Sequence, residues 1–203
     1  MDKNINVLDI IVTFVKAIKE TPKNKEKMPY YYFDDKENRI WGAKYLLGQI
    51  LRQYRLDANH IIVSKRADEL WKEITGEESI HNHGYRDVIK SKVDRKIIKY
   101  SGASKKGENA ELKVGESFIW NDIFHDEHVI PIADIIEHLI SLDELNYGNV
   151  QNILNNIYMC RILKEENAGL THKRPFSVVK AIEEVYNSKG IEILGWEEKK
   201  KNL

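Results

Sequence analysis

The sequence predicts a mostly helical α+β protein, and two observations support this fold class. In most of the chain, apolar residues recur at the spacing of one face of a helix. Two short apolar segments, residues 120–131 and 155–163, instead have the length of strands, and a helix start with acidic residues over 164–170 follows the second one. The C-terminal half is therefore expected to contain a strand, a long connection, a strand and a helix, in this order.

The other elements follow from spacing and from capping residues. Helices are expected over residues 4–18, 40–56, 132–140 and 176–186. Ser64 is expected to cap a helix that stops at Gly76, and Ser141 to cap a helix that reaches Leu154. Residues 61–63 fit either a short buried strand or the lead-in to the next helix. A final strand is expected over 191–196, before a disordered lysine-rich end at 199–201.

The amino-acid composition excludes several classes of protein. The 203 residues, 42% of them hydrophobic, suffice for a real core, and Lys plus Arg equal Asp plus Glu at 32 each. With this balance the protein lacks the overall positive charge that is typical of nucleic-acid-binding proteins. A single cysteine excludes an intrachain disulfide and a Cys-rich zinc module. The longest apolar runs are far shorter than the ~20 residues of a bilayer span, and no basic segment leads into a signal core, so we expect a cytoplasmic protein without a membrane partner.

The domain organisation is expected to divide into two regions. Residues 1–84 read as a helical N-terminal region, and residues 85–203 as a second region that ends in a C-terminal helix, or the two form one compact domain overall.

A candidate site lies in the first of the two strand-like segments. Two imidazoles and three carboxylates interrupt its apolar and aromatic residues: Asp122, His125, Asp126, Glu127 and His128. Burial of such groups is costly unless they are paired, hydrogen-bonded or bound to metal. The segment therefore predicts a functional site.

The end of this segment, Glu127-His128-Val129-Ile130-Pro131, resembles the core of the HNH, or ββα-metal, endonucleases. The resemblance continues with Asn156-Ile157 before the second strand and Asn167 in the helix after it, and it covers about residues 115–175. The chain departs from the common pattern in three ways. Its connection between the strands is longer and helical, Glu127 stands where Asp is usual, and Glu166 fits the third position as readily as Asn167.

The resemblance implies a metal-dependent endonuclease that hydrolyses phosphodiester bonds in DNA, of restriction or defence type. His128 would be the general base, and Asn155 or Asn156 would orient it. Glu127, with Glu166 or Asn167, would hold Mg²⁺ or another divalent cation such as Mn²⁺. Because one such site cleaves one strand, a homodimer is expected on a symmetric target.

Basic residues offer candidate contacts with nucleic acid. Six lie in the stretch 85–106, namely Lys90, Lys92, Arg95, Lys96, Lys105 and Lys106, and two in a turn, Lys173 and Arg174. They would either neutralise phosphates or form a solvated face. His81 and His83 lie in a polar segment without a third ligand nearby, which favours a loop over a metal site.

Two other functions fit the same residues. One is a metal-dependent phosphohydrolase of helical fold, with His125, His128 and His138 beside Asp126, Asp134 and Glu137. It requires a helix throughout residues 120–140, against which Pro131 argues. The other is a non-catalytic module that binds nucleic acid or protein and needs no divalent ion.

Overall fold

The computed structural model describes residues 6–20, 31–33, 39–54, 58–75, 78, 97–100, 110–113 and 123–203. The contacts divide the chain into two compact units, each made of two stretches of sequence. The first, here called the helical unit, comprises Met1–Arg55 and Ile130–Ile157. The second, the sheet unit, comprises Leu56–Val129 and Tyr158–Leu203.

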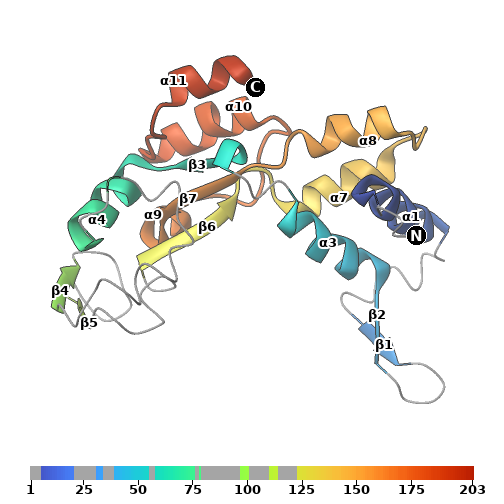
Figure 1. Cartoon of the computed structure of the whole chain (residues 1–203), viewed down its shortest axis with the longest axis horizontal. Coiled ribbons are helices and arrows are strands. Elements are labelled where there is room, and N and C mark those ends of the chain that lie inside the picture. The colour runs from blue at the N-terminus through green and yellow to red at the C-terminus, as the bar shows by residue number, and fades with distance from the viewer. Residues whose placement is uncertain are drawn as a thin grey trace, which may run out of the picture. The chain divides into compact units, whose positions relative to one another are not determined.

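Four helices pack together in the helical unit (Figure 1): α1 (Val7–Glu20), α3 (Ala43–Gln53), α7 (Ile132–Ser141) and α8 (Tyr147–Leu154). Each buries one apolar stripe, as with Ile11, Val15 and Ile18 on α1. The side chain of Asn146 caps α8 by accepting from the Asn149 N–H at 2.8 Å. The unit also contains an antiparallel pair of strands, β1 (Tyr31–Phe33) and β2 (Arg39–Trp41).

A mixed three-stranded sheet is the centre of the sheet unit. Its middle strand, β7 (Met159–Leu163), pairs in parallel with β3 (Ile61–Val63) and antiparallel with β6 (Phe124–His128). All three residues of β3 and four of the five in β7 are buried, which explains why these strands are apolar apart from Arg161. The antiparallel pair β4 (Ile97–Tyr100) and β5 (Ala110–Lys113) belongs to the same unit.

Short helices complete the sheet unit (Figure 1). They are η1 (Ala58–His60), α4 (Lys65–Thr75), α9 (Lys164–Ala168), α10 (Val178–Lys180), the π-helical η3 (Ala181–Tyr186), η4 (Asn187–Lys189), α11 (Trp196–Lys199) and η5 (Lys200–Asn202). Trp71 of α4 contacts Phe124 of β6 edge to face, with 6.2 Å between ring centroids. The helix α9 contacts both β6 and β7.

The fold is α+β and mostly helical, as predicted, and several elements are confirmed. The expected helices at 4–18, 132–140 and 176–186 occur, and Gly190 ends the last one with a φ of 72°. Ser64 accepts from the Ala67 N–H at 3.1 Å as the expected cap, and residues 61–63 form a strand.

Four expectations were wrong. The helix expected at 40–56 begins at Ala43, because residues 39–41 pair as β2. Asn146, not Ser141, caps α8, while the Ser141 hydroxyl bonds back to the His138 carbonyl. Residues 191–196 contribute only one isolated bridge, between Ile193 and Ser64. The lysine-rich end is helical, and Lys200 contacts Glu183 and Glu197 there.

No helix in the described part of the chain has both the length and the apolar character that crossing a bilayer requires.

Candidate functional site

The polar residues of β6 divide between the two faces of the sheet. Successive side chains of a strand point to opposite faces, and residues directly opposite each other on paired strands share one face. Asp126 lies opposite Arg161, with 3.3 Å between Oδ1 and Nε. Glu127 lies opposite Cys160, and His125 shares its face. The face that carries Glu127 is the one contacted by the C-terminal segments.

Arg174 organises this face. Its guanidinium, in a side chain that is 1% exposed, donates to Oε1 of Glu127 at 2.7 Å and to the carbonyls of His128 and Val129 at 2.9 and 3.1 Å. It also donates to the Tyr186 hydroxyl at 3.3 Å and lies 5.5 Å from the centroid of that ring. Through these bonds Arg174 fixes the end of β6 to the segment that leads into α10.

Glu127 is held in its ionised form by two neighbours. Burial raises the pKa of this carboxyl group, but the hydrogen bond from His125 and the positive charge of Arg174 outweigh burial, and the pKa lies below its ordinary value of 4.5. The bond from His125 joins its Nε2 to Oε2 of Glu127 at 3.1 Å.

Glu166 lies on α9 and is buried. Its Oε2 accepts from the Leu163 N–H at 2.8 Å, which caps the start of α9, and from the Ser64 hydroxyl at 2.7 Å. The same Ser64 oxygen caps α4. Glu166 therefore links the start of α9, which follows β7, to the start of α4, which follows the neighbouring strand β3.

Cys160 is the buried residue around which these acids gather. Burial raises the pKa of its thiol well above the ordinary value of 9.0, and the negative charges of Glu166 and Glu127 raise it further. Glu127 lies opposite Cys160 on the paired strand, and Glu166 lies on the helix that follows β7 directly.

His128 ends β6, opposite Met159. Its ring is half-buried, and its Nε2 is shielded from solvent. His125 is the more accessible histidine of the strand, with a side chain that is 40% exposed.

The remaining predicted site residues are not all brought to β6. Asn155 and Asn156 belong to the helical unit and bond within the end of α8: Asn155 accepts from Gln151 at 3.0 Å, and Asn156 donates to the Asn152 carbonyl at 3.2 Å. Asn167 is half-buried on α9.

The structure agrees with the expected nucleic-acid contact at only one of the two basic residues of the turn. Lys173 is exposed and can meet a phosphate, whereas the guanidinium of Arg174 is buried and bonded within the protein, so the expectation that Arg174 contacts nucleic acid is not supported. Lys90, Lys92, Arg95, Lys96, Lys105 and Lys106 lie outside the described residues, as do His81 and His83.

The geometry bears on the metal hypotheses in two ways. Within the described ranges, no group of three or more His, Cys, Asp or Glu side chains could hold a metal ion. The helical phosphohydrolase is overturned, because residues 124–128 form a strand and α7 begins only at Ile132. Among the described residues, each Glu127 oxygen has one hydrogen-bond partner, Arg174 for Oε1 and His125 for Oε2, and a carboxylate oxygen can accept more than one bond.

Sequence reasoning missed three residues of this site. The role of Arg174 as the partner of Glu127, the Tyr186 hydroxyl beside it, and the bond from Ser64 to Glu166 were not expected. One signal pointed to them: a carboxylate in a buried strand requires a cation or a donor. That signal predicts a partner without identifying it.

Comparison of the chain with protein-family models, with curated proteins and with solved structures found no match.

Proposed function

We propose that the protein is a metal-dependent endonuclease of the ββα-metal type that hydrolyses phosphodiester bonds in DNA. One observation carries the proposal. The strands β6 and β7 pair antiparallel, α9 follows β7 directly and contacts both strands, and β6 carries the carboxylate of Glu127 with the ring of His125 bonded to it at 3.1 Å. A strand pair and a helix that gather acidic groups beside a histidine are the parts that metal-assisted hydrolysis of a phosphodiester needs.

His128 follows Glu127 at the end of β6, where the alternation of the strand directs the two side chains to opposite faces. It is proposed as the group that takes the proton of the attacking water, because an imidazole is largely neutral at cellular pH. Glu127 is proposed as the first ligand of the ion, since the bonds from Arg174 and His125 keep it ionised and fix its orientation. Asn167 is the preferred second ligand, because Glu166 is committed to the start of α9 and to Ser64. The ion itself, Mg²⁺ or Mn²⁺, supplies stabilisation of the charge on the phosphate and the leaving oxygen.

Recognition is assigned to basic groups away from β6. The stretch that holds Lys90, Lys92, Arg95, Lys96, Lys105 and Lys106, together with exposed Lys173, is proposed to contact phosphates. We further propose that the protein works in the cytoplasm as a restriction or defence enzyme and as a homodimer, whose existence sedimentation equilibrium would test.

A plasmid assay tests the activity. The wild type should nick or linearise supercoiled DNA with Mg²⁺ or Mn²⁺ and not with EDTA, and His128→Ala should lose about 10²- to 10⁴-fold in rate. His125→Ala is assayed in parallel, because His125 is the more accessible ring. His172→Ala is the matched control, since His172 is exposed in the turn beside Lys173. Cleavage by His128→Ala at the wild-type rate would remove His128 from the mechanism.

Calorimetry with Mg²⁺ and Mn²⁺ tests the ligands. Glu127→Gln and Asn167→Ala should each weaken ion binding, whereas Glu165→Gln, a change in a carboxylate of α9 that pairs with Arg66, should not. An unchanged affinity in Glu127→Gln would contradict the assignment.

A non-catalytic nucleic-acid-binding module is the second candidate. It is favoured by one observation: the two acids expected to bind metal already have partners in the protein, Arg174 for Glu127 and Ser64 for Glu166. This candidate predicts DNA binding that EDTA leaves unchanged, no cleavage and no heat of ion binding, so the same two experiments separate it from the endonuclease.

A further inference from the structure

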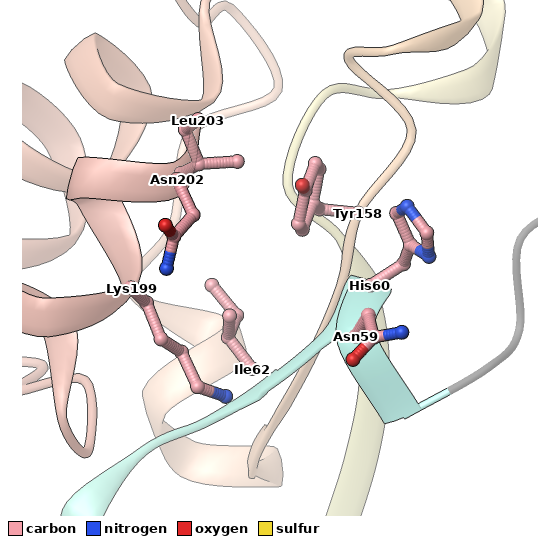
Figure 2. A pocket seen from close by; sticks show the side chains of 7 residues that line it. All are labelled: Asn59, His60, Ile62, Tyr158, Lys199, Asn202 and Leu203. Atoms are coloured by element: carbon pink, nitrogen blue, oxygen red, sulfur yellow. The ribbon is translucent and has the colours of Figure 1, made fainter.

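A pocket of about 450 Å³ lies in the sheet unit, where the start of the parallel pair β3 and β7 meets the C-terminal helices. Figure 2 shows Lys199 and Asn202 on one side of it and Asn59, His60 and Tyr158 on the other, with Ile62 between them. Its volume lies within the range of small-molecule sites, ~300 to 1,000 Å³. No residue assigned to the endonuclease lines it.

The lining has the chemistry of a site for an anion. It contains an ammonium group, an imidazole and two carboxamides, and none of the seven lining side chains is acidic. Lys199 is half-buried and anchored, because its Nζ donates to the Ile61 carbonyl at 3.2 Å. Burial lowers the pKa of this ammonium group, and a negatively charged ligand at its side would compensate the lost hydration.

The lining also offers aromatic rings. Tyr158 and His60 are in contact, with centroids 5.3 Å apart and planes at 52°. Both are half-buried, so they present ring surface at the wall of the pocket. A planar base stacks on such a surface, and carboxamides such as those of Asn59 and Asn202 can pair with the polar edge of a base.

We propose that this pocket binds a nucleotide, with the phosphate beside Lys199 and the base against Tyr158 and His60. The shared ligand chemistry is a phosphorylated nucleoside, either free or at the end of a strand. The inference does not rest on the endonuclease proposal, because it involves neither β6 nor a divalent ion.

The test measures binding to the full chain without divalent ions by isothermal titration calorimetry. The probes are adenosine 5′-monophosphate, adenosine, inorganic phosphate and a short oligonucleotide that begins with the same 5′-phosphorylated nucleotide. The wild type should bind adenosine 5′-monophosphate at least about tenfold more tightly than adenosine or phosphate, because only the nucleotide uses both halves of the pocket. Binding of the oligonucleotide as well would identify the strand end as a source of the ligand, and binding of the mononucleotide alone would identify the free form.

Lys199→Met and Lys201→Met form a matched pair, since each removes one positive charge and Lys201 does not line the pocket. Lys199→Met should weaken binding of the nucleotide about ten- to hundredfold and leave adenosine unchanged, whereas Lys201→Met should leave both unchanged. Tyr158→Leu should weaken nucleotide and adenosine alike by about tenfold. Thermal unfolding verifies that each variant is folded, and Asn202→Ala, an exposed change, replaces Lys199→Met if that variant does not fold.

Binding of neither adenosine 5′-monophosphate nor the oligonucleotide would overturn the proposal. Equal loss in Lys199→Met and Lys201→Met would do the same, because it would show a general effect of charge.

Discussion

Arg174 and Glu127 are separated by 47 positions in the chain and form an ion pair with 2.7 Å between Nη2 and Oε1. The arginine side chain is almost fully buried. Its Nη1 donates to the carbonyls of His128 and Val129 at the end of β6, and its Nε donates to the Thr171 carbonyl. The pair therefore connects the one strand that carries the candidate site to the C-terminal segment, and its removal affects several bonds at once.

We expect Arg174→Met to lower the free energy of unfolding by about 3–5 kcal/mol, because it leaves the charge of Glu127 and the carbonyls of His128 and Val129 without their donor. Lys173→Met, a change in the exposed neighbour, should cost no more than about 0.5 kcal/mol. Urea unfolding followed by circular dichroism measures both. Similar losses in the two variants would contradict a structural role for Arg174.

Stability should depend on pH through Glu127. Its pKa is lower in the folded protein than in the unfolded chain, so the ionised carboxylate stabilises the fold above its ordinary pKa of 4.5, and this contribution is lost as the pH falls through the lowered value. Urea unfolding from pH 7 to pH 3 should show the stability advantage of the wild type over Glu127→Gln shrinking in acid. A constant difference across that range would show that the charge of Glu127 is not the cause.

Ser64 and Glu166 should be energetically coupled through their buried bond of 2.7 Å. Glu166→Ala should lower the free energy of unfolding by about 1–3 kcal/mol, because the Leu163 N–H and the Ser64 hydroxyl lose their acceptor. A double-mutant cycle with Ser64→Ala should give a coupling energy of about 0.5–3 kcal/mol. Strictly additive losses would indicate independent caps, and a loss of Mg²⁺ affinity in Glu166→Ala would return this residue to the metal shell.

The thiol of Cys160 should be inert in the native protein. It is fully buried, and burial raises its pKa well above 9.0, so little reactive thiolate is present at neutral pH. Reaction with Ellman's reagent should be fast in urea and should follow the rate or extent of unfolding in its absence. Stoichiometric labelling within seconds under native conditions would contradict the described packing of β7.

Binding to DNA should depend on salt through the basic stretch. If Lys90, Lys92, Lys105 and Lys106 contact phosphates, neutralising two of them should flatten the plot of log affinity against log salt by about one unit per lost contact. Fluorescence anisotropy with a duplex compares the wild type with the Lys90→Ala, Lys92→Ala and the Lys105→Ala, Lys106→Ala double variants. Equal slopes of log affinity against log salt in all three proteins would show that the basic residues of 85–106 do not contact phosphates and only face solvent.

An element of the fold could be predicted from the sequence when the interactions that form it lie within its own residues. The helices α1 and α7 were predicted to within a few residues, because the apolar residues on the buried face of a helix recur at a regular spacing in its own sequence. The strand β2 was missed, since its pairing with β1 outweighs the helical spacing of residues 40 and 41. The helical C-terminal end was missed for the same reason, because Lys199 and Lys200 bond to groups far away in the sequence.

The sequence predicted where the candidate site lies, but it did not predict which residues bond to the site's charged groups. Acidic and imidazole groups within an apolar, strand-like segment indicated β6, because burial of such groups has to be compensated. The compensating groups lie in other elements: Arg174 for Glu127, and Ser64 for Glu166. No periodicity relates such pairs, so only the folded arrangement identifies them.

The bond between the Val129 N–H and the Tyr158 carbonyl, at 2.9 Å, joins the two ends of the segment that runs from β6 to β7. Everything between these residues, including α7 and α8, leaves the sheet unit and returns at one point. The entropy of closing such a loop grows only with the logarithm of its length. The entropy of pairing β6 with β7 therefore depends little on the length of the segment between residues 129 and 158.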